Sequence, residues 1–275
     1  MAALLALLAS LLWGAADFAG GTLSRRVHPM AVVGAAHVVG LVGLLTWATV
    51  TGAFAAPLGW LPWAIPCGLI SYLGLAAFYA GLACGQMGVV APISASGAVI
   101  PVVVGLLSGE RPGGLQFAGI ACALVGIVLA SGPEVSERVN VPSIGYALLA
   151  ALTYGTVLVL LAHGSVYSPQ MTLVGMRVTS VLVVLGLAVM LRSRFGVDRS
   201  GAGWLLVVGI GDTLANALYA VASRHGSVAL VAVAASLFPA VTVLLARQFH
   251  QERLRPVQVA GVLAVLAGVA GITGG

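Results

Sequence analysis

GERPGGLQFAG, at Gly109–Gly119, has a close copy in QERLRPVQVAG, at Gln251–Gly261. Glu252 follows Glu110 by 142 residues (252 − 110), and the glutamine six residues after each acid keeps the same spacing. This spacing is close to half of the 275-residue chain. Because similarity at a fixed period is the mark of an internal repeat, the copy predicts that the second half of the chain repeats the first.

Two further pairs of segments support this duplication. GVVAPISASGAVIP, at Gly88–Pro101, aligns with GSVALVAVAASLFP, at Gly226–Pro239, at an offset of 138 residues (226 − 88). LASLLWG, at Leu8–Gly14, aligns with LAALTYG, at Leu149–Gly155, at an offset of 141 (149 − 8). Widely separated segments thus agree on nearly the same offset in the same order, which indicates one duplicated unit.

The composition places this duplicated chain in a membrane. Hydrophobic residues make up 60% of the chain and charged residues 7%, whereas soluble domains carry about 25% charged residues. Apolar runs of roughly 20 residues recur along the chain, and a helix of that length crosses a hydrocarbon core about 30 Å thick. The sequence therefore predicts an all-α polytopic membrane protein.

Glycine, proline and charged residues divide the apolar runs into ten expected transmembrane helices. They lie at residues 2–22, 30–52, 61–84, 88–107, 114–131, 143–162, 169–191, 203–223, 227–249 and 256–272. The first five form a repeat over residues 1–131 and the last five a repeat over 143–275, joined by a polar linker at 132–142. Since five is odd, the second repeat enters the membrane from the opposite side. Two inverted five-helix repeats around a central cavity are typical of secondary transporters.

Several other functional classes find no support in the sequence. Twelve arginines and seven acidic residues give a formal net charge of +5, but the arginines lie mostly at span ends, where they anchor helices. We therefore expect no nucleic-acid partner. Cys67, Cys84 and Cys122 lie within apolar spans and lack metal-ligand spacing, and the sequence has no phosphate-binding GxxxxGK[ST] loop. We expect no catalytic residue, no metal and no cofactor, and hence no enzyme.

The LLWG motif at Leu11–Gly14, the Gly-Glu-Arg and Gln-Glu-Arg turns and the duplicated five-helix plan together resemble the EamA-type transporters of the drug/metabolite transporter superfamily. The resemblance covers essentially the whole chain. It implies a basket of ten helices around a substrate cavity, and transport of small metabolites that are amino-acid-like or drug-like. We expect a secondary transporter that works by alternating access, favours export and is a monomer in the lipid bilayer.

Five polar side chains lie within the expected spans. An ionisable group near the bilayer centre costs about 3 kcal/mol on insertion scales, so it needs a partner or a water-filled cavity. The five are Asp17, His37, Arg177, Asp212 and Asn216, of which His37 and Arg177 are equivalent in the repeat (177 − 37 = 140).

Two interpretations of these side chains stay open. In the first they line the cavity, where Arg177 holds a substrate carboxylate and Asp17, Asp212 or His37 carries a coupling proton. In the second, Arg177 and Asp212 form a structural ion pair that joins two helices, and Asp17 lies near the membrane surface.

Five aromatic residues are candidate cavity walls. They are Trp13, Phe18, Tyr79, Tyr154 and Tyr219, of which Trp13 and Tyr154 are repeat-equivalent (154 − 13 = 141). Such rings either stack on a substrate or pack between helices and anchor them at the interface. Both interpretations stay open.

Pro101 and Pro239 occupy equivalent places in the fourth and ninth expected helices and predict a kink in each. Pro101 precedes Glu110 by nine residues and Pro239 precedes Glu252 by thirteen, so the fourth helix should end about one turn sooner than the ninth. The two acidic turns lie on opposite membrane faces and cannot form one site. We expect each acid to cap its own helix hairpin, with the following glutamine bonded to nearby backbone.

Two alternative functions remain. GIGDT, at Gly209–Thr213, matches the GxGD motif of intramembrane aspartyl proteases, whose chemistry needs two facing carboxylates. The only other acid in an expected span is Asp17, and the tyrosine and Pro-Ala-Leu elements that accompany the motif in that family are absent. A channel or structural membrane protein is the other alternative, although the sequence has no filter-like repeat.

The arginines give conflicting information about membrane orientation. Expected loops on one face carry nine arginines, and those on the other face carry two, Arg111 and Arg224. The positive-inside rule alone makes the richer face cytoplasmic and leaves both termini outside. The resemblance implies cytoplasmic termini, so orientation stays open. A chain without lysine but rich in Ala, Gly and Arg is typical of a GC-rich bacterium, which favours the inner membrane.

Overall fold

The computed structural model describes residues 1–130, 141–190, 201–251 and 256–274, and this part of the chain is helical without strands. Helices suit an apolar chain because each satisfies its own backbone N–H and C=O groups in a medium without water. The first half contains α1 (Ala2–Ser24), α2 (Pro29–Thr51), α3 (Leu61–Cys84), α4 (Met87–Ala95), α5 (Val99–Leu107) and α6 (Gly114–Ala130). The second contains α7 (Val141–Tyr167), α8 (Pro169–Met190), α9 (Ala202–Ala222), α10 (Val228–Ala235), α11 (Phe238–His250) and α12 (Pro256–Gly274). Short 3-10 turns are η1 (Ala53–Ala55), η2 (Leu58–Trp60) and η3 (Ser96–Ala98).

Eight helical segments of the described chain are long and apolar enough to cross a membrane. Two of these consist of consecutive helices, α4 with α5 and α10 with α11. Helix α6 adds a shorter apolar stretch at Gly114–Gly126, and α12 occupies the tenth expected position. The predicted all-helical membrane architecture is confirmed. Most of the expected linker at 132–142 lies outside the described residues.

The fourth and ninth expected helices are both broken just before their prolines. Turn η3 separates α4 from α5 and precedes Pro101, while Ser236 and Leu237 separate α10 from α11 and precede Pro239. A proline has no N–H to donate and clashes with the preceding turn, so the predicted kinks are confirmed. Helix α5 ends six residues after its proline (107 − 101) and α11 ends eleven after its own (250 − 239). The predicted earlier end of the fourth helix is therefore confirmed as well.

The residue that follows each of these helix ends has left-handed backbone geometry. Gly109 has φ 91° and Gln251 has φ 58°, and the two positions are equivalent in the repeat (251 − 109 = 142). The duplicated turn thus keeps its backbone shape although glycine is retained in only one copy.

Glu110 caps a helix of the other half. Its carboxylate accepts hydrogen bonds from the N–H groups of Val228 (2.8 Å) and Ala229 (3.2 Å) and from the hydroxyl of Ser227. Helix α5 packs against α10, so the carboxylate meets the N-terminus of α10, where N–H groups lack partners within the helix and carry partial positive charge. The prediction that Glu110 caps its own hairpin is wrong, because packing between the halves supplies better donors.

The glutamine that follows behaves as expected. Gln116 accepts a hydrogen bond at Oε1 from the N–H of Gly113 (2.9 Å). Glu252, Arg253 and the side chain of Gln258, which carry the second copy of this arrangement, lie outside the described part of the chain.

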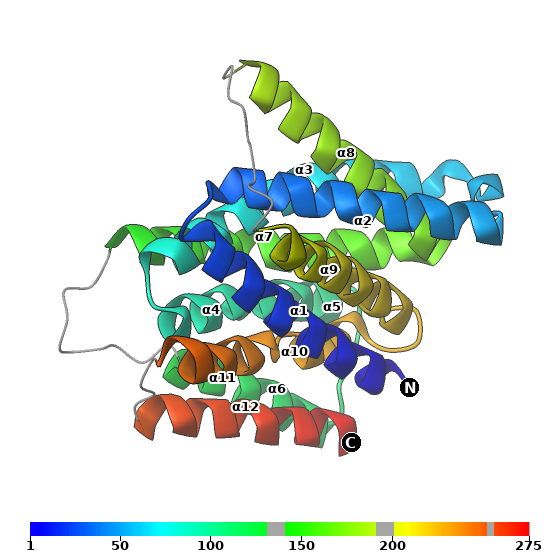
Figure 1. The fold of residues 1–275 in the computed structure, drawn as a ribbon. Helices are drawn as coiled ribbons and strands as arrows, with labels where there is room; N and C mark the ends of the chain where they lie inside the picture. The colour runs from blue at the N-terminus through cyan, green and yellow to red at the C-terminus, as the bar shows by residue number, and fades with distance from the viewer. Residues whose placement is uncertain (131–140, 191–200, 252–255, 275) are drawn as a thin grey trace.

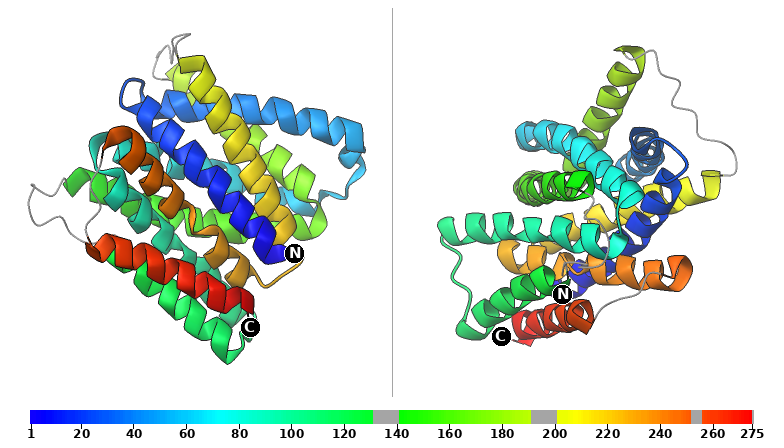
Figure 2. Two further views of the ribbon diagram at one scale, coloured as in Figure 1. Left: turned by 60° about the horizontal axis from the view of Figure 1, so that its bottom comes forward. Right: turned by 90° about the vertical axis from the view of Figure 1, so that its left-hand side faces the viewer.

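The two halves interlock rather than stand apart. The first helix of each half packs on the third helix of the other, α1 on α9 and α7 on α3, and these are among the most extensive helix pairings. Helix α2 likewise contacts α8, and α6 contacts α12. In Figure 1 α6 and α12 lie side by side along one edge, and both chain ends lie on the same side of the molecule. Both views of Figure 2 show the same α6–α12 pair.

A contact between α6 and α12 shows the two-fold relation at atomic scale. The Sγ atom of Cys122 lies 3.3 Å from the carbonyl oxygen of Ala264, and these two residues are equivalent in the repeat (264 − 122 = 142). Equivalent residues touch each other only close to a symmetry axis. The helices come close because Gly268 has no side chain: an added Cβ would lie 2.6 Å from the carbonyl oxygen of Gly119.

Candidate functional site

A pocket lies between the two halves, with lining residues from α1, α2, α3, α7, α8 and α9 and from both broken helices. Its empty space, counted with the solvent at its mouth, is about 660 Å³. Small-molecule sites typically enclose about 300–1,000 Å³. Seven of the ten candidate residues from the sequence line it: Trp13, Asp17, His37, Tyr154, Arg177, Asp212 and Asn216.

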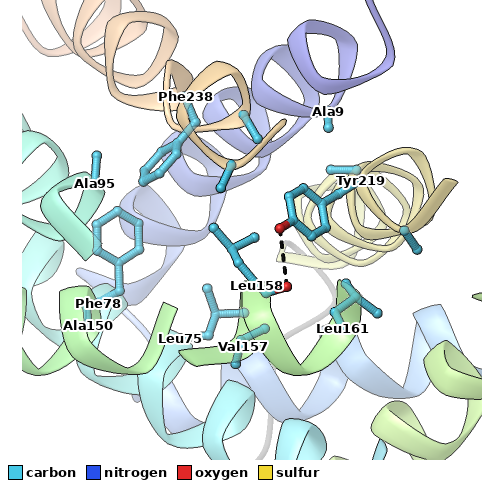
Figure 3. Close-up of a cluster of buried hydrophobic side chains, with 14 of the residues drawn as sticks. Ala9, Leu75, Phe78, Ala95, Ala150, Val157, Leu158, Leu161, Tyr219 and Phe238 are labelled. Atoms are coloured by element: carbon cyan, nitrogen blue, oxygen red, sulfur yellow. Dashed lines mark hydrogen bonds between the residues drawn. The ribbon is translucent and has the colours of Figure 1, made fainter. Parts of the chain in front are cut away.

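The other three candidates, Phe18, Tyr79 and Tyr219, do not line this pocket. Phe18 packs against aromatic rings of α9 and α11, with its ring centroid 5.6 Å from that of Phe249. Tyr79 donates a hydrogen bond to the carbonyl of Ala16 (3.5 Å), and Tyr219 donates one to the carbonyl of Leu158 (3.2 Å; Figure 3).

The two tyrosines are repeat-equivalent (219 − 79 = 140). Each ties the third helix of its half to the first helix of the same half. In this conformation their hydroxyls serve the packing of helices.

Asp212 is the centre of a buried polar cluster. Its Oδ2 forms an ion pair with Nη2 of Arg177 on α8. Its Oδ1 accepts hydrogen bonds from the indole N–H of Trp13 on α1 (3.2 Å) and from Nδ2 of Asn216 one turn along α9 (3.0 Å). Asn216 also donates to the Asp212 carbonyl (2.7 Å). The cluster joins three helices, and all four side chains also line the pocket.

Asp17 differs from Asp212 in having no partner. It lies one helical turn after Trp13 on the same face of α1, is 4% exposed and lines the pocket. Its carboxylate forms no hydrogen bond or ion pair with a described residue. A carboxylate buried within a membrane helix is costly unless it is protonated or paired, so Asp17 is the group of this pocket most in need of a ligand.

Donors without partners also occur around the pocket. His37 is 1% exposed, and neither of its ring nitrogens has a hydrogen-bond partner. The hydroxyl of Tyr154 and Nε of Arg177 are likewise buried without partners. Buried polar groups are nearly always satisfied, so these atoms indicate a space built to receive a polar molecule.

The pocket is assembled from repeat-equivalent residues. Six equivalent pairs face it: Trp13 with Tyr154, Asp17 with Leu158, Ser71 with Asp212, Leu75 with Asn216, His37 with Arg177, and Ala98 with Ser236. The first four pairs share an offset of 141 residues (for example 158 − 17). The sequence analysis missed Ser71, Leu75 and Leu158, although the offset applied to Asp212, Asn216 and Asp17 points to each of them.

Comparison with known proteins agrees with this architecture. A model of the EamA-like transporter family matches the chain twice, at residues 1–132 and at 141–274. The chain belongs to the EamA-like transporter family. The resemblance inferred from the duplicated turns is therefore confirmed, and the pocket described above lies between the two matched copies of the EamA-like unit.

The EamA-like fold is also found among solved structures, of which 27 chains match significantly. One crystal structure, described only as that of a protein, has a TM-score of 0.79 and 17% sequence identity over 99% of this chain and 96% of that chain. At this identity the likeness concerns the fold alone. No curated protein sequence matches this EamA-like transporter significantly.

Proposed function

We propose that this chain is a secondary transporter that exports small amino-acid-like or drug-like solutes across the bacterial inner membrane by alternating access. In this proposal ten helices cross the membrane and the central pocket binds the solute. The observation that carries the proposal is the unpartnered carboxylate of Asp17 in a pocket shared by two inverted repeats. An intramembrane ionisable side chain marks a functional site by default.

The inverted repeat supplies a route to alternating access. Two similar halves of opposite orientation can exchange conformations, which opens a shared central site first to one face and then to the other. The broken helices α4–α5 and α10–α11 both contribute pocket residues at or beside their breaks, Ala98 and Ser236. A break removes backbone hydrogen bonds, so bending there costs less than bending a continuous helix.

A proton is the coupling ion that the site suits best. Asp17 has no counter-charge within hydrogen-bonding distance, so binding a proton would remove its buried charge. Asp212 already has Arg177 as a partner, which makes it the less suitable proton carrier. In this scheme Asp17 exchanges a proton for the solute.

The contacts of Asp212 argue against a protease. An aspartyl protease needs two carboxylates that share a proton. Although Asp17 and Asp212 line the same pocket, both oxygens of Asp212 are held by Arg177, Trp13 and Asn216. An arginine partner keeps a carboxylate ionised, which opposes proton sharing.

Reconstitution in proteoliposomes tests the transport proposal. Currents on a solid-supported membrane would be recorded for a panel of organic amines and amino acids, with and without a pH gradient. Saturable, gradient-driven currents that Asp17→Asn abolishes are expected. Arg111→Gln, which removes an exposed charge outside the pocket, should transport normally. Non-saturable flux down the gradient only would indicate a channel and overturn the proposal.

A further inference from the structure

The pocket is two-fold symmetric in position but not in chemistry. One wall, here called the charged wall, consists of Trp13, Asp17, Arg177, Asp212 and Asn216. The repeat-equivalent residues form the neutral wall, Tyr154, Leu158, His37, Ser71 and Leu75. After duplication, one copy of the wall thus carries two carboxylates and a guanidinium, and the other carries none.

The charged wall has an uncompensated negative charge. Asp212 is paired with Arg177, and the pair leaves no net charge. Asp17 has no such partner. With His37, the remaining titratable side chain of the two walls, in its neutral form, the two walls together carry one carboxylate without a counter-charge. A ligand that replaces a proton there must bring a positive charge.

An aromatic ring stands beside this carboxylate. Trp13 lies four residues before Asp17, on the same face of α1, and its indole N–H is held by Asp212 (3.2 Å). The ring is thereby fixed while it lines the pocket. Cations bind favourably at such ring faces, so carboxylate and ring together suit an ammonium group.

Next to the neutral wall the pocket is apolar. Leu75, Val157, Leu158 and Phe238 all line it, from α3, α7 and α11. Figure 3 shows these side chains gathered in one cluster, with the Leu158 side chain extending toward the neighbouring helices. No formal charge is present among these four residues, so they favour the hydrocarbon part of a ligand.

Given the proposed function, which makes this pocket the solute site, we infer that the solute is an amphipathic organic cation whose ammonium group binds Asp17 and whose apolar body lies against Leu75, Leu158 and Phe238. The carboxylate of an amino acid is not required, because Asp212 already occupies Arg177. The divergence of the two walls after duplication is what gives the pocket one end for charge and one for hydrocarbon.

Binding to the purified protein in lipid nanodiscs tests this inference with ligands that share a tail. Hexylamine, 1-hexanol, hexanoate and norleucine differ mainly in the head group. Hexylamine is expected to bind at least roughly tenfold more tightly than hexanol or hexanoate, since a hydrogen-bonded charge contributes about 1.5–3 kcal/mol. From propylamine to hexylamine each added methylene should tighten binding roughly fourfold, from about 0.8 kcal/mol per buried CH₂.

Two matched variants separate the two ends. Asp17→Asn should remove the preference for amine over alcohol, and Asp17→Glu should retain it, which controls for folding. Leu158→Asn places the same amide at the equivalent position of the other repeat. It should keep the preference for amine and weaken the gain per methylene.

Several results would overturn the inference: hexanoate or norleucine binding more tightly than hexylamine, an unchanged amine preference in Asp17→Asn, or no binding by any ligand of the series. The transport proposal fails separately. Amine binding without solute-driven currents in proteoliposomes would sink transport and leave the site assignment, whereas currents with an anionic solute and no amine binding would do the reverse.

Discussion

The ion pair of Arg177 with Asp212 shows how one residue depends on another inside the membrane. Arg177 is 1% exposed and its Nε has no partner, so its charge is compensated almost entirely by one carboxylate. Both interpretations reached from the sequence apply in part, because the pair joins α8 to α9 and also lines the pocket.

A double-mutant cycle on this pair should show strong coupling. Arg177→Met leaves Asp212 buried and unpaired, which costs about 3–5 kcal/mol for a broken buried pair. The double variant Arg177→Met/Asp212→Asn removes both charges and should recover most of that loss. Thermal melting in detergent, followed by size-exclusion chromatography, measures the effect. Additive losses in the double variant would contradict this expectation.

The two left-handed residues predict opposite responses to substitution. Left-handed backbone costs a non-glycine residue roughly 1–2 kcal/mol. Gly109→Ala should therefore lower stability by about 1 kcal/mol, although an added Cβ there would meet no atom within 4 Å. Gln251→Gly, at the equivalent position, should raise stability by a similar amount. If both variants melt at the same temperature as the parent, backbone strain is not the cause.

At the scale of elements, the end of α5 is fastened to the start of α10. Glu110 accepts three hydrogen bonds there, two of them from backbone N–H groups of the opposite half. The contact joins one broken helix to the other, so it couples the two elements whose breaks border the pocket.

Removing this helix cap should destabilise the protein measurably. Glu110→Ala is expected to cost about 1–2 kcal/mol, the usual value for a lost helix N-cap. Glu110→Gln keeps an acceptor oxygen and should lose about half as much, because only the charge is removed. Arg111→Ala is the matched control in the next, exposed position and should melt like the parent. Equal melting of Glu110→Ala and the control would refute the capping role.

At the scale of the whole molecule, the interlocking of the halves predicts that neither folds alone. Helix α1 needs α9, and α7 needs α3, to bury its packed face. Residues 1–131 expressed alone should therefore be degraded, whereas co-expression with residues 143–275 should restore a complex that co-purifies. A stable, monodisperse first half on its own would show that the repeats are independent domains.

The arginine distribution predicts the orientation of the whole molecule. Helices alternate through the membrane, so the face with nine arginines lies opposite both termini. Of these nine, Arg25, Arg26 and Arg247 are in the described chain and exposed, as loop residues and helix ends that set topology must be. By the positive-inside rule this face is cytoplasmic. A C-terminal alkaline phosphatase fusion should be active, and a fluorescent C-terminal GFP fusion in its place would contradict the rule here.

Much of the fold could be read from the sequence because a duplication repeats its spacing. The apolar runs indicated membrane helices, and the offset indicated inverted halves. The prolines marked the helix breaks near Ser96–Ala98 and Ser236. The sequence also named seven pocket residues, since polar groups within apolar spans have few places to go. It missed Leu75, Leu158 and Phe238 because an apolar residue that lines a pocket looks like any other in such a chain.

What the sequence determined by itself is the class of fold, the repeat and the presence of buried charge, because composition and spacing are properties of the chain alone. Tertiary structure decided which charges are partners. Asp212 and Asp17 are equally conspicuous in the sequence, yet packing gives one an arginine, an indole and an amide and leaves the other without a partner. Glu110 finds its donors in the other half for the same reason. Contacts between halves depend on how helices far apart in the chain pack together, which spacing along the chain does not encode.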